Sequence, residues 1–179
     1  SLMDVAKIYF QNARTIMLKD GYHTSIFIPL KDNRPGELIV AQPESRIDKY
    51  LLVRDIAHFV KRTNSNGLIH IAEAWMAAAD DIPKGKFAEH AKERREILTL
   101  AAVNSDGEQI HLSAKITRKS LKRWKVKELA STETEIGGRL FSLAPVLEVW
   151  GKLDVLDLKA DDEDMKWLDQ HFKDEVPGS

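Results

Sequence analysis

Basic residues gather in one segment of the chain, Lys115–Lys127, which contains seven Lys or Arg and no Asp or Glu. Trp124 lies among them. Lys and Arg side chains neutralise phosphates with release of counterions, and an exposed indole stacks on unpaired bases. The segment therefore predicts an interface for single-stranded nucleic acid. The residues that would form it are Arg118, Lys119, Lys122, Arg123, Trp124 and Lys125. The alternative is a solvated strand edge, whose lysines discourage pairing with another sheet and whose Trp124 faces the core.

Two arginines, Arg95 and Arg118, face each other if Asp106–Gly107 forms a two-residue turn between flanking strands. Like charges directly opposite each other on a sheet are destabilising unless an anion or a carboxylate lies between them. The pair therefore predicts an anion-binding patch. The alternative is a carboxylate from the chain itself, supplied by Asp80, Asp81 or the acidic C-terminal segment.

The histidines are the other candidates for chemistry. His23 and Ser25 share one face of a predicted strand, as a general base and a nucleophile would, but the sequence spacing places no acid to orient the histidine. One hypothesis is a small hydrolase or transferase that uses His23, His70 or His111. The simpler interpretation is that these are polar residues of strand surfaces. Metal-protease and phosphate-loop motifs do not occur in the sequence. We assign no catalytic residue, no metal and no cofactor, and we expect a protein that is not an enzyme.

The C-terminal residues 153–179 differ in charge from the rest of the chain. Between residues 152 and 175 there are nine Asp or Glu and four Lys. We predict an acidic helical tail with a disordered end. Such a tail either folds onto the basic segment and tunes its binding, or docks as a helix at the edge of the domain.

The overall composition is that of a globular protein, with 43% hydrophobic residues, 31% charged residues and a net charge of −1. At 179 residues the chain suits one domain, which we place at residues 1–152. The absence of Cys excludes disulfides and thiolate metal sites and fits an intracellular protein. No segment has the form of a membrane span or of a signal peptide. We therefore expect a cytoplasmic protein without a membrane partner.

The spacing of apolar residues predicts the helices. Residues 3–19 show the pattern of an amphipathic helix, and residues 45–63 show a second one with an unusually wide apolar face. Arg139–Trp150 also has helical spacing, although Pro145 conflicts with an unbroken helix there.

Alternating and β-branched residues predict the strands. Tyr22–Leu30 and Glu37–Gln42 form two of them, joined by a loop of more than two residues, and Leu68–Met76 forms a third. Residues 94–118 form a hairpin around the two-residue Asp106–Gly107 turn. That turn would place Val103 opposite Ile110, Ala101 opposite Leu112 and Ile97 opposite Ile116.

These elements predict an α+β fold, an antiparallel sheet of about five strands with helices packed on one face. The function we favour from the sequence is a non-enzymatic binding or regulatory module that acts through protein contacts as a homo-oligomer. Its basis is a C-terminal third with segregated charge and with Trp150, Trp167 and Phe172 available for contacts. Nucleic-acid binding through residues 115–127, tuned by the acidic tail, is the alternative.

Overall fold

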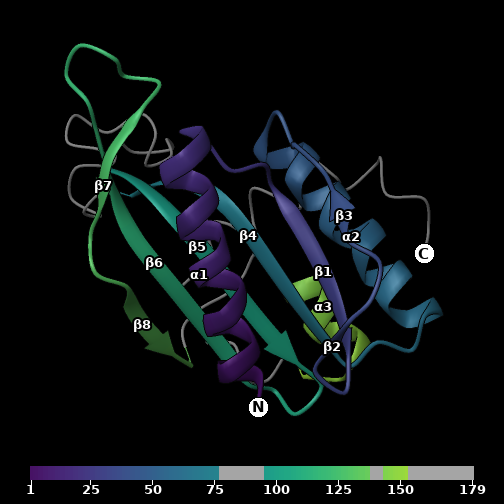
Figure 1. Cartoon of the computed structure of the whole chain (residues 1–179). Coiled ribbons are helices and arrows are strands. Elements are labelled where there is room, and N and C mark those ends of the chain that lie inside the picture. The colour runs from purple at the N-terminus through teal and green to yellow at the C-terminus, as the bar shows by residue number, and fades with distance from the viewer. Residues whose placement is uncertain (77–94, 138–142, 153–179) are drawn as a thin grey trace.

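The fold is α+β, as predicted, and is built on one curled antiparallel sheet (Figure 1). The computed structural model describes residues 1–76, 95–137 and 143–152. The helices are α1 (Leu2–Asp20), α2 (Arg46–Arg62) and α3 (Ala144–Val149). The strands are β1 (Ile26–Lys31), β2 (Arg34–Pro35), β3 (Ile39–Val40), β4 (Gly67–Met76), β5 (Arg95–Asn104), β6 (Gln109–Arg118), β7 (Val126–Leu129) and β8 (Glu133–Ile136). The predicted tail, residues 153–179, lies outside the described residues.

The sheet is larger than the five strands expected from the sequence. Its order is β2-β1-β4-β5-β6-β7, with β3 also paired to β1 and β8 also paired to β6. The long strands β4, β5 and β6 form its centre, and β7 and β8 follow one another along the outer side of β6.

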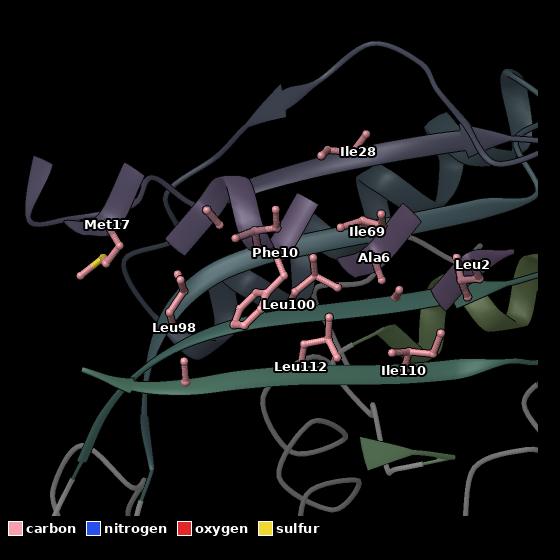
Figure 2. Close-up of a cluster of buried hydrophobic side chains, with 14 of the residues drawn as sticks. Leu2, Ala6, Phe10, Met17, Ile28, Ile69, Leu98, Leu100, Ile110 and Leu112 are labelled. Carbon is pink, nitrogen blue, oxygen red and sulfur yellow. The ribbon is translucent and has the colours of Figure 1, made fainter. Parts of the chain in front are cut away.

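Helix α1 covers one face of the sheet. Ser1 caps its first turn, and Gly21 ends it in the left-handed conformation with φ of 81°. Side chains at helical spacing, among them Ala6, Phe10 and Met17, are buried against β1, β4, β5 and β6. Figure 2 shows Phe10 on the sheet beside Leu100. Each large side chain buried in this way contributes roughly 1.5–3 kcal/mol to folding.

Helices α2 and α3 cover the opposite face (Figure 1). The prediction that the helices pack on one face is therefore wrong. The reason lies in β5, which is apolar on both sides. Leu98 and Leu100 face α1, whereas Ala101 and Val103 belong to the core beneath α2 and α3.

The conflict around Pro145 is resolved because α3 begins at Ala144, and proline is tolerated in a first helical turn.

The central hairpin, β5–β6, is shifted by one residue from the predicted register. Ala102 pairs with Ile110 and Leu100 with Leu112, so the predicted partners of Val103 and Ala101 are wrong. The loop has three residues, because Asn104 pairs across it with Glu108. The Asn104 side-chain oxygen accepts the backbone N–H groups of Asp106 and Glu108 at 3.1 and 3.0 Å. Of the turn residues only Gly107 has positive φ, at 84°, whereas a two-residue type I′ turn requires two such residues.

The two-residue turn occurs instead between β1 and β2. Asp32 and Asn33 have φ of 50° and 64°, and Lys31 pairs directly with Arg34. The longer loop predicted there is therefore wrong. Asn66, which precedes β4, holds this turn through two side-chain hydrogen bonds to Asp32, each 2.9 Å long. Asn and Asp adopt left-handed conformations more readily than other residues with a side chain.

Candidate functional site

The basic loop, residues 119–125, joins β6 to β7 and projects from one end of the sheet (Figure 1). Backbone hydrogen bonds close it, from Lys119 N–H to the Lys125 oxygen and from Lys125 N–H to the Lys122 oxygen. Its apolar side chains face outward, because Leu121 is 93% exposed and Trp124 is 67% exposed. The Trp124 indole is therefore outside both hydrophobic cores.

Arg118 fixes the base of the basic loop. Its Nε lies 2.9 Å from each carboxylate oxygen of Glu96, and Nη2 donates a further bond to the same carboxylate. Its Nη1 donates to the backbone oxygens of Gly21 and Arg123, at 2.9 and 3.2 Å. The hydrogen bonds and charge of Glu96 raise the pKa of Arg118. One side chain thus joins the end of α1, the start of β5 and the basic loop.

Gly21 brings the end of α1 against the same loop. A Cβ atom at this position would lie 2.1 Å from the backbone oxygen of Trp124. Only glycine fits such an approach, and only glycine adopts its φ of 81° without strain. The backbone of Trp124 is therefore held against α1 while its indole remains exposed.

A β-bulge lies on β7 beside Arg118. The register between β6 and β7 shifts after Thr117, so that Arg118 pairs with Val126 and Lys127 is left over. The extra residue belongs to β7, so the bulge bends β7 at the point where it leaves the basic loop.

An open pocket of about 440 Å³ lies beside the basic loop, where β4, β5 and β6 meet. The residues that line it are Trp75, Arg95, Glu96, Lys115, Ile116, Arg118, Lys119, Ser120 and Arg123. Five of these are basic and one is acidic, and the acidic one is already paired with Arg118. The remaining four cations make no ion pair with any residue of 1–76, 95–137 or 143–152. The pocket therefore favours anions.

The structure brings the residues predicted for nucleic-acid binding together on one surface. Arg118, Lys119 and Arg123 line the pocket, and Lys122, Trp124 and Lys125 are exposed on the basic loop. Arg118 differs from the others because its guanidinium is occupied by bonds within the protein.

Both residues of the predicted anion-binding pair, Arg95 and Arg118, line this pocket. The two are not opposite each other, because Lys115 pairs with Ile97 in the shifted register. That register places Arg95 and Lys115 on one face of the sheet and Arg118 on the other. The carboxylate beside Arg118 comes from Glu96, whereas Asp80, Asp81 and the acidic C-terminal segment, which were named from the sequence, lie outside the described residues.

Sequence reasoning missed Trp75 and Glu96 as parts of this site. They are paired neighbours on β4 and β5. Their only signal in the sequence is their position near the ends of two predicted strands, and the pairing register of those strands cannot be read from residue types alone.

Ser25 pairs with a histidine, but with His70 and not with His23 as the sequence suggested. The Ser25 hydroxyl lies 3.1 Å from Nε2 of His70, whose ring stacks on Phe27 with centroids 4.0 Å apart. Burial, together with the nearby charge of Lys49, lowers the pKa of His70 to about 3. Ser25 and His70 are 5% and 7% exposed, so the pair is closed to a substrate of any size. Within the described parts of the chain no carboxylate bonds to His70, and its observed role is to satisfy a buried hydroxyl.

The other two histidines are separate from this pair. His23 bonds through Nδ1 to the Thr24 oxygen at 2.7 Å, and its backbone N–H donates to Glu73 at 3.0 Å. Burial raises the pKa of Glu73. His111 faces Glu135 of β8 on the far side of β6. The histidine-based enzyme stays a prediction.

No group of three or more metal-ligating side chains occurs in the described ranges. Within the same ranges, no helix has both the length and the apolar character needed to cross a membrane.

Comparison with known proteins identifies the family. The family model described as bacteriophage lambda protein ea47 matches residues 1–159. Protein ea47 of Escherichia phage lambda is 31% identical over 141 residues, which cover 78% of this chain. The chain spans only 34% of the length of that relative. No solved structure matches the chain. The extent of the family match shows that the chain belongs to the family of bacteriophage lambda protein ea47.

Proposed function

We propose that this chain binds single-stranded nucleic acid, without sequence preference, through the basic loop. The observation that carries the proposal is the exposure of Trp124. The alternative interpretation of the basic segment requires this indole to lie in the core, whereas it is 67% exposed. Base–aromatic stacking contributes about 1–3 kcal/mol per base and tolerates any sequence.

The charges around Trp124 support the same proposal. Lys119, Lys122, Arg123 and Lys125 are all exposed on the basic loop, within a few residues of the indole. Cations beside a stacking ring follow the backbone of a single strand while the ring holds a base. Because Arg118 and Gly21 already fix the backbone of the loop, little conformational entropy is lost when a strand binds.

The protein-contact hypothesis draws less support from the same structure. Trp150, one of its three aromatic residues, packs against the core beneath α2 and α3, and its Nε1 donates to the Ser65 oxygen at 3.1 Å. The other two, Trp167 and Phe172, lie outside the described residues. A protein partner and a homo-oligomer stay predictions.

The test compares loop variants by fluorescence anisotropy with labelled single strands and duplexes over a salt series. We expect Trp124→Ala to weaken single-strand binding by about tenfold and to leave duplex binding nearly unchanged. Leu121→Ala is the matched control, because Leu121 is an exposed apolar residue of the same loop without an aromatic face.

A charge-reversal variant tests the electrostatic part in the same assay. Changing Lys122, Arg123 and Lys125 to Glu removes three phosphate contacts, which lowers affinity at 0.1 M salt by about a hundredfold and reduces the salt slope by about two. The control reverses Lys7, Lys31 and Arg34, which are also exposed but belong to α1 and to the β1–β2 hairpin instead of the loop. Binding that is weak and indifferent to both the reversal and Trp124→Ala would contradict the proposal.

A further inference from the structure

The pocket beside the basic loop contains more cations than the proposed binding of a single strand requires. That binding needs only base stacking on Trp124 and loop cations that follow the nucleic-acid backbone. The cations of the pocket come from three different elements, with Arg95 at the start of β5, Lys115 near the end of β6 and Arg123 in the basic loop. They surround one concave space, whereas Lys122 and Lys125 of the loop do not line it.

The carboxylate of Glu96, the acidic residue among the described residues that line the pocket, does not cancel this charge. Glu96 is bound by the guanidinium of Arg118, and both side chains are only 18% exposed. The cations left for an anion in the pocket are therefore Arg95, Lys115, Lys119 and Arg123. Charge-assisted hydrogen bonds to such groups are about twice as strong as neutral ones.

We propose that the pocket binds the terminal phosphomonoester of a nucleic-acid strand, an inference that rests on the proposed single-strand binding. A phosphomonoester carries about −1.5 to −2 charges at pH 7 and three strong acceptor oxygens. An internal phosphodiester carries a single charge, which one or two cations of the exposed loop already neutralise. Convergence of cations from three elements on one space matches the terminal group better.

The size and the remaining lining residues fit a terminal nucleotide. The volume of about 440 Å³ lies within the usual range of small-ligand sites, about 300–1,000 Å³. Ser120 adds a hydroxyl that donates to a phosphate oxygen. Trp75 also lines the pocket. Trp124 then stacks on a base further along the strand.

The experiment compares oligothymidylates of one length that end in a 5′-phosphate, in a 3′-phosphate or in hydroxyl groups only. We expect the wild-type chain to bind one or both phosphorylated strands about tenfold more tightly than the hydroxyl-ended strand. The two phosphorylated strands show which end of the nucleic acid the pocket takes. Equal affinity for all three strands would overturn the inference and would leave the proposed single-strand binding intact.

Pocket variants test whether the preference for phosphorylated strands depends on the pocket. The double change R95Q/K115Q is expected to bring the phosphorylated-to-hydroxyl affinity ratio close to one, with little change in binding of the hydroxyl-ended strand. The loop control K122Q/K125Q should weaken binding of all three strands and keep the ratio. Arg123→Gln provides a second pocket variant outside the strands, in case the double change disturbs folding. A ratio that survives in both pocket variants would contradict the inference.

Titration with mononucleotides tests the pocket inference independently of the proposed single-strand binding. Thymidine 5′-monophosphate and 3′-monophosphate are titrated against the wild-type chain by calorimetry, with thymidine as the control. If no strand binds but a monophosphate binds and R95Q/K115Q abolishes that binding, the proposed single-strand function fails and the pocket still takes a phosphomonoester. If strands bind without end preference and neither monophosphate binds, only the pocket inference fails.

Discussion

At the scale of single residues, some polar side chains are used for hydrogen bonds within the protein, whereas others face the pocket and can bind a ligand. Arg118 uses its guanidinium on one carboxylate and two backbone oxygens, whereas Arg95 and Lys115 face the open pocket. Residue type alone does not distinguish these roles. Both arginines are predicted from the sequence as anion ligands, and only the hydrogen-bond geometry shows which one is already occupied.

The buried pair of Ser25 and His70 gives a residue-scale prediction about pH. The pKa of His70 is about 3 in the folded chain, against an ordinary value of 6.5, so the unfolded chain binds the extra proton between these values. The free energy of unfolding therefore falls as pH decreases below 6.5, by up to about 1.4 kcal/mol per pH unit. Between pH 7 and pH 5 we expect this histidine to account for a loss of about 2 kcal/mol.

Urea denaturation of the wild type and of His70→Gln at both pH values measures this loss. Glutamine keeps a polar partner for Ser25 but does not titrate, so the stability of the variant should fall less between pH 7 and pH 5 than that of the wild type. His111, whose pKa burial also lowers, is present in both proteins and cancels in the comparison. An identical fall in both proteins would show that His70 is not held neutral in the folded chain.

At the scale of elements, the contact between Gly21 and the backbone of Trp124 gives a further prediction. Gly21→Ala adds strain at a φ of 81° and a methyl group 2.1 Å from a backbone oxygen. Gly151→Ala is a matched control, because Gly151 also follows a helix with φ of 68° but has nothing within 4 Å. We expect Gly151→Ala to cost about 1–2 kcal/mol of stability from the left-handed conformation alone.

The cost of Gly21→Ala should exceed that of the control, and the variant should also alter the fluorescence of Trp124 because the loop must move. Thermal or urea unfolding, followed by emission spectra of the folded variants, measures both effects. Equal costs for the two substitutions would mean that the loop retreats from α1 without loss of stability.

Element boundaries could largely be predicted from this sequence, whereas pairing could not. The apolar spacing of α1 and α2 and the alternation of β5 and β6 identify those elements to within a few residues. The register of β5–β6 depends on the Asn104 side chain, whose bonds to its own turn lengthen the loop by one residue. A shift of one residue moves each side chain to the other face of the sheet. This shift separates Arg95 from Arg118 and cannot be found from propensities.

At the scale of the whole molecule, the pocket depends on segments that are distant in the chain. Trp75 and Arg95 are brought together by β4 and β5, and the basic loop joins them through the bond between Arg118 and Glu96. The basic segment could be recognised from the sequence because its cations are contiguous. The pocket could not, because its lining depends on the pairing of strands whose register is set by the folded chain.

The acidic segment gives a whole-molecule prediction. In the full chain, the acidic residues between 161 and 164 are replaced by their amides. We expect tighter single-strand binding at low salt, by a few-fold, because fewer carboxylates compete for the cations of the basic loop. Anisotropy measures the change, and the control replaces four exposed acidic residues in the described part of the chain. These are Glu37, Glu44, Asp55 and Asp106.

If both sets of substitutions strengthen binding equally, the effect comes from net charge alone. If neither changes it, the acidic segment does not act on the loop.

The two ends of the sheet are held by different kinds of bond. In a salt titration, the end without an ion pair therefore serves as an internal control for the end that has one. At one end Asn66 joins two turns through hydrogen bonds that are not ion pairs, to Asp32 by its side chain and to the Ser105 N–H by its backbone oxygen. At the other end the ion pair of Arg118 and Glu96 holds the site together. Dissolved ions weaken an ion pair more than an amide bond. If salt weakens binding because it loosens the site, amide hydrogen exchange should become faster near Arg118 and Glu96 and stay unchanged near Asn66. If salt ions only compete with the protein for the nucleic-acid strand, exchange should stay unchanged at both ends.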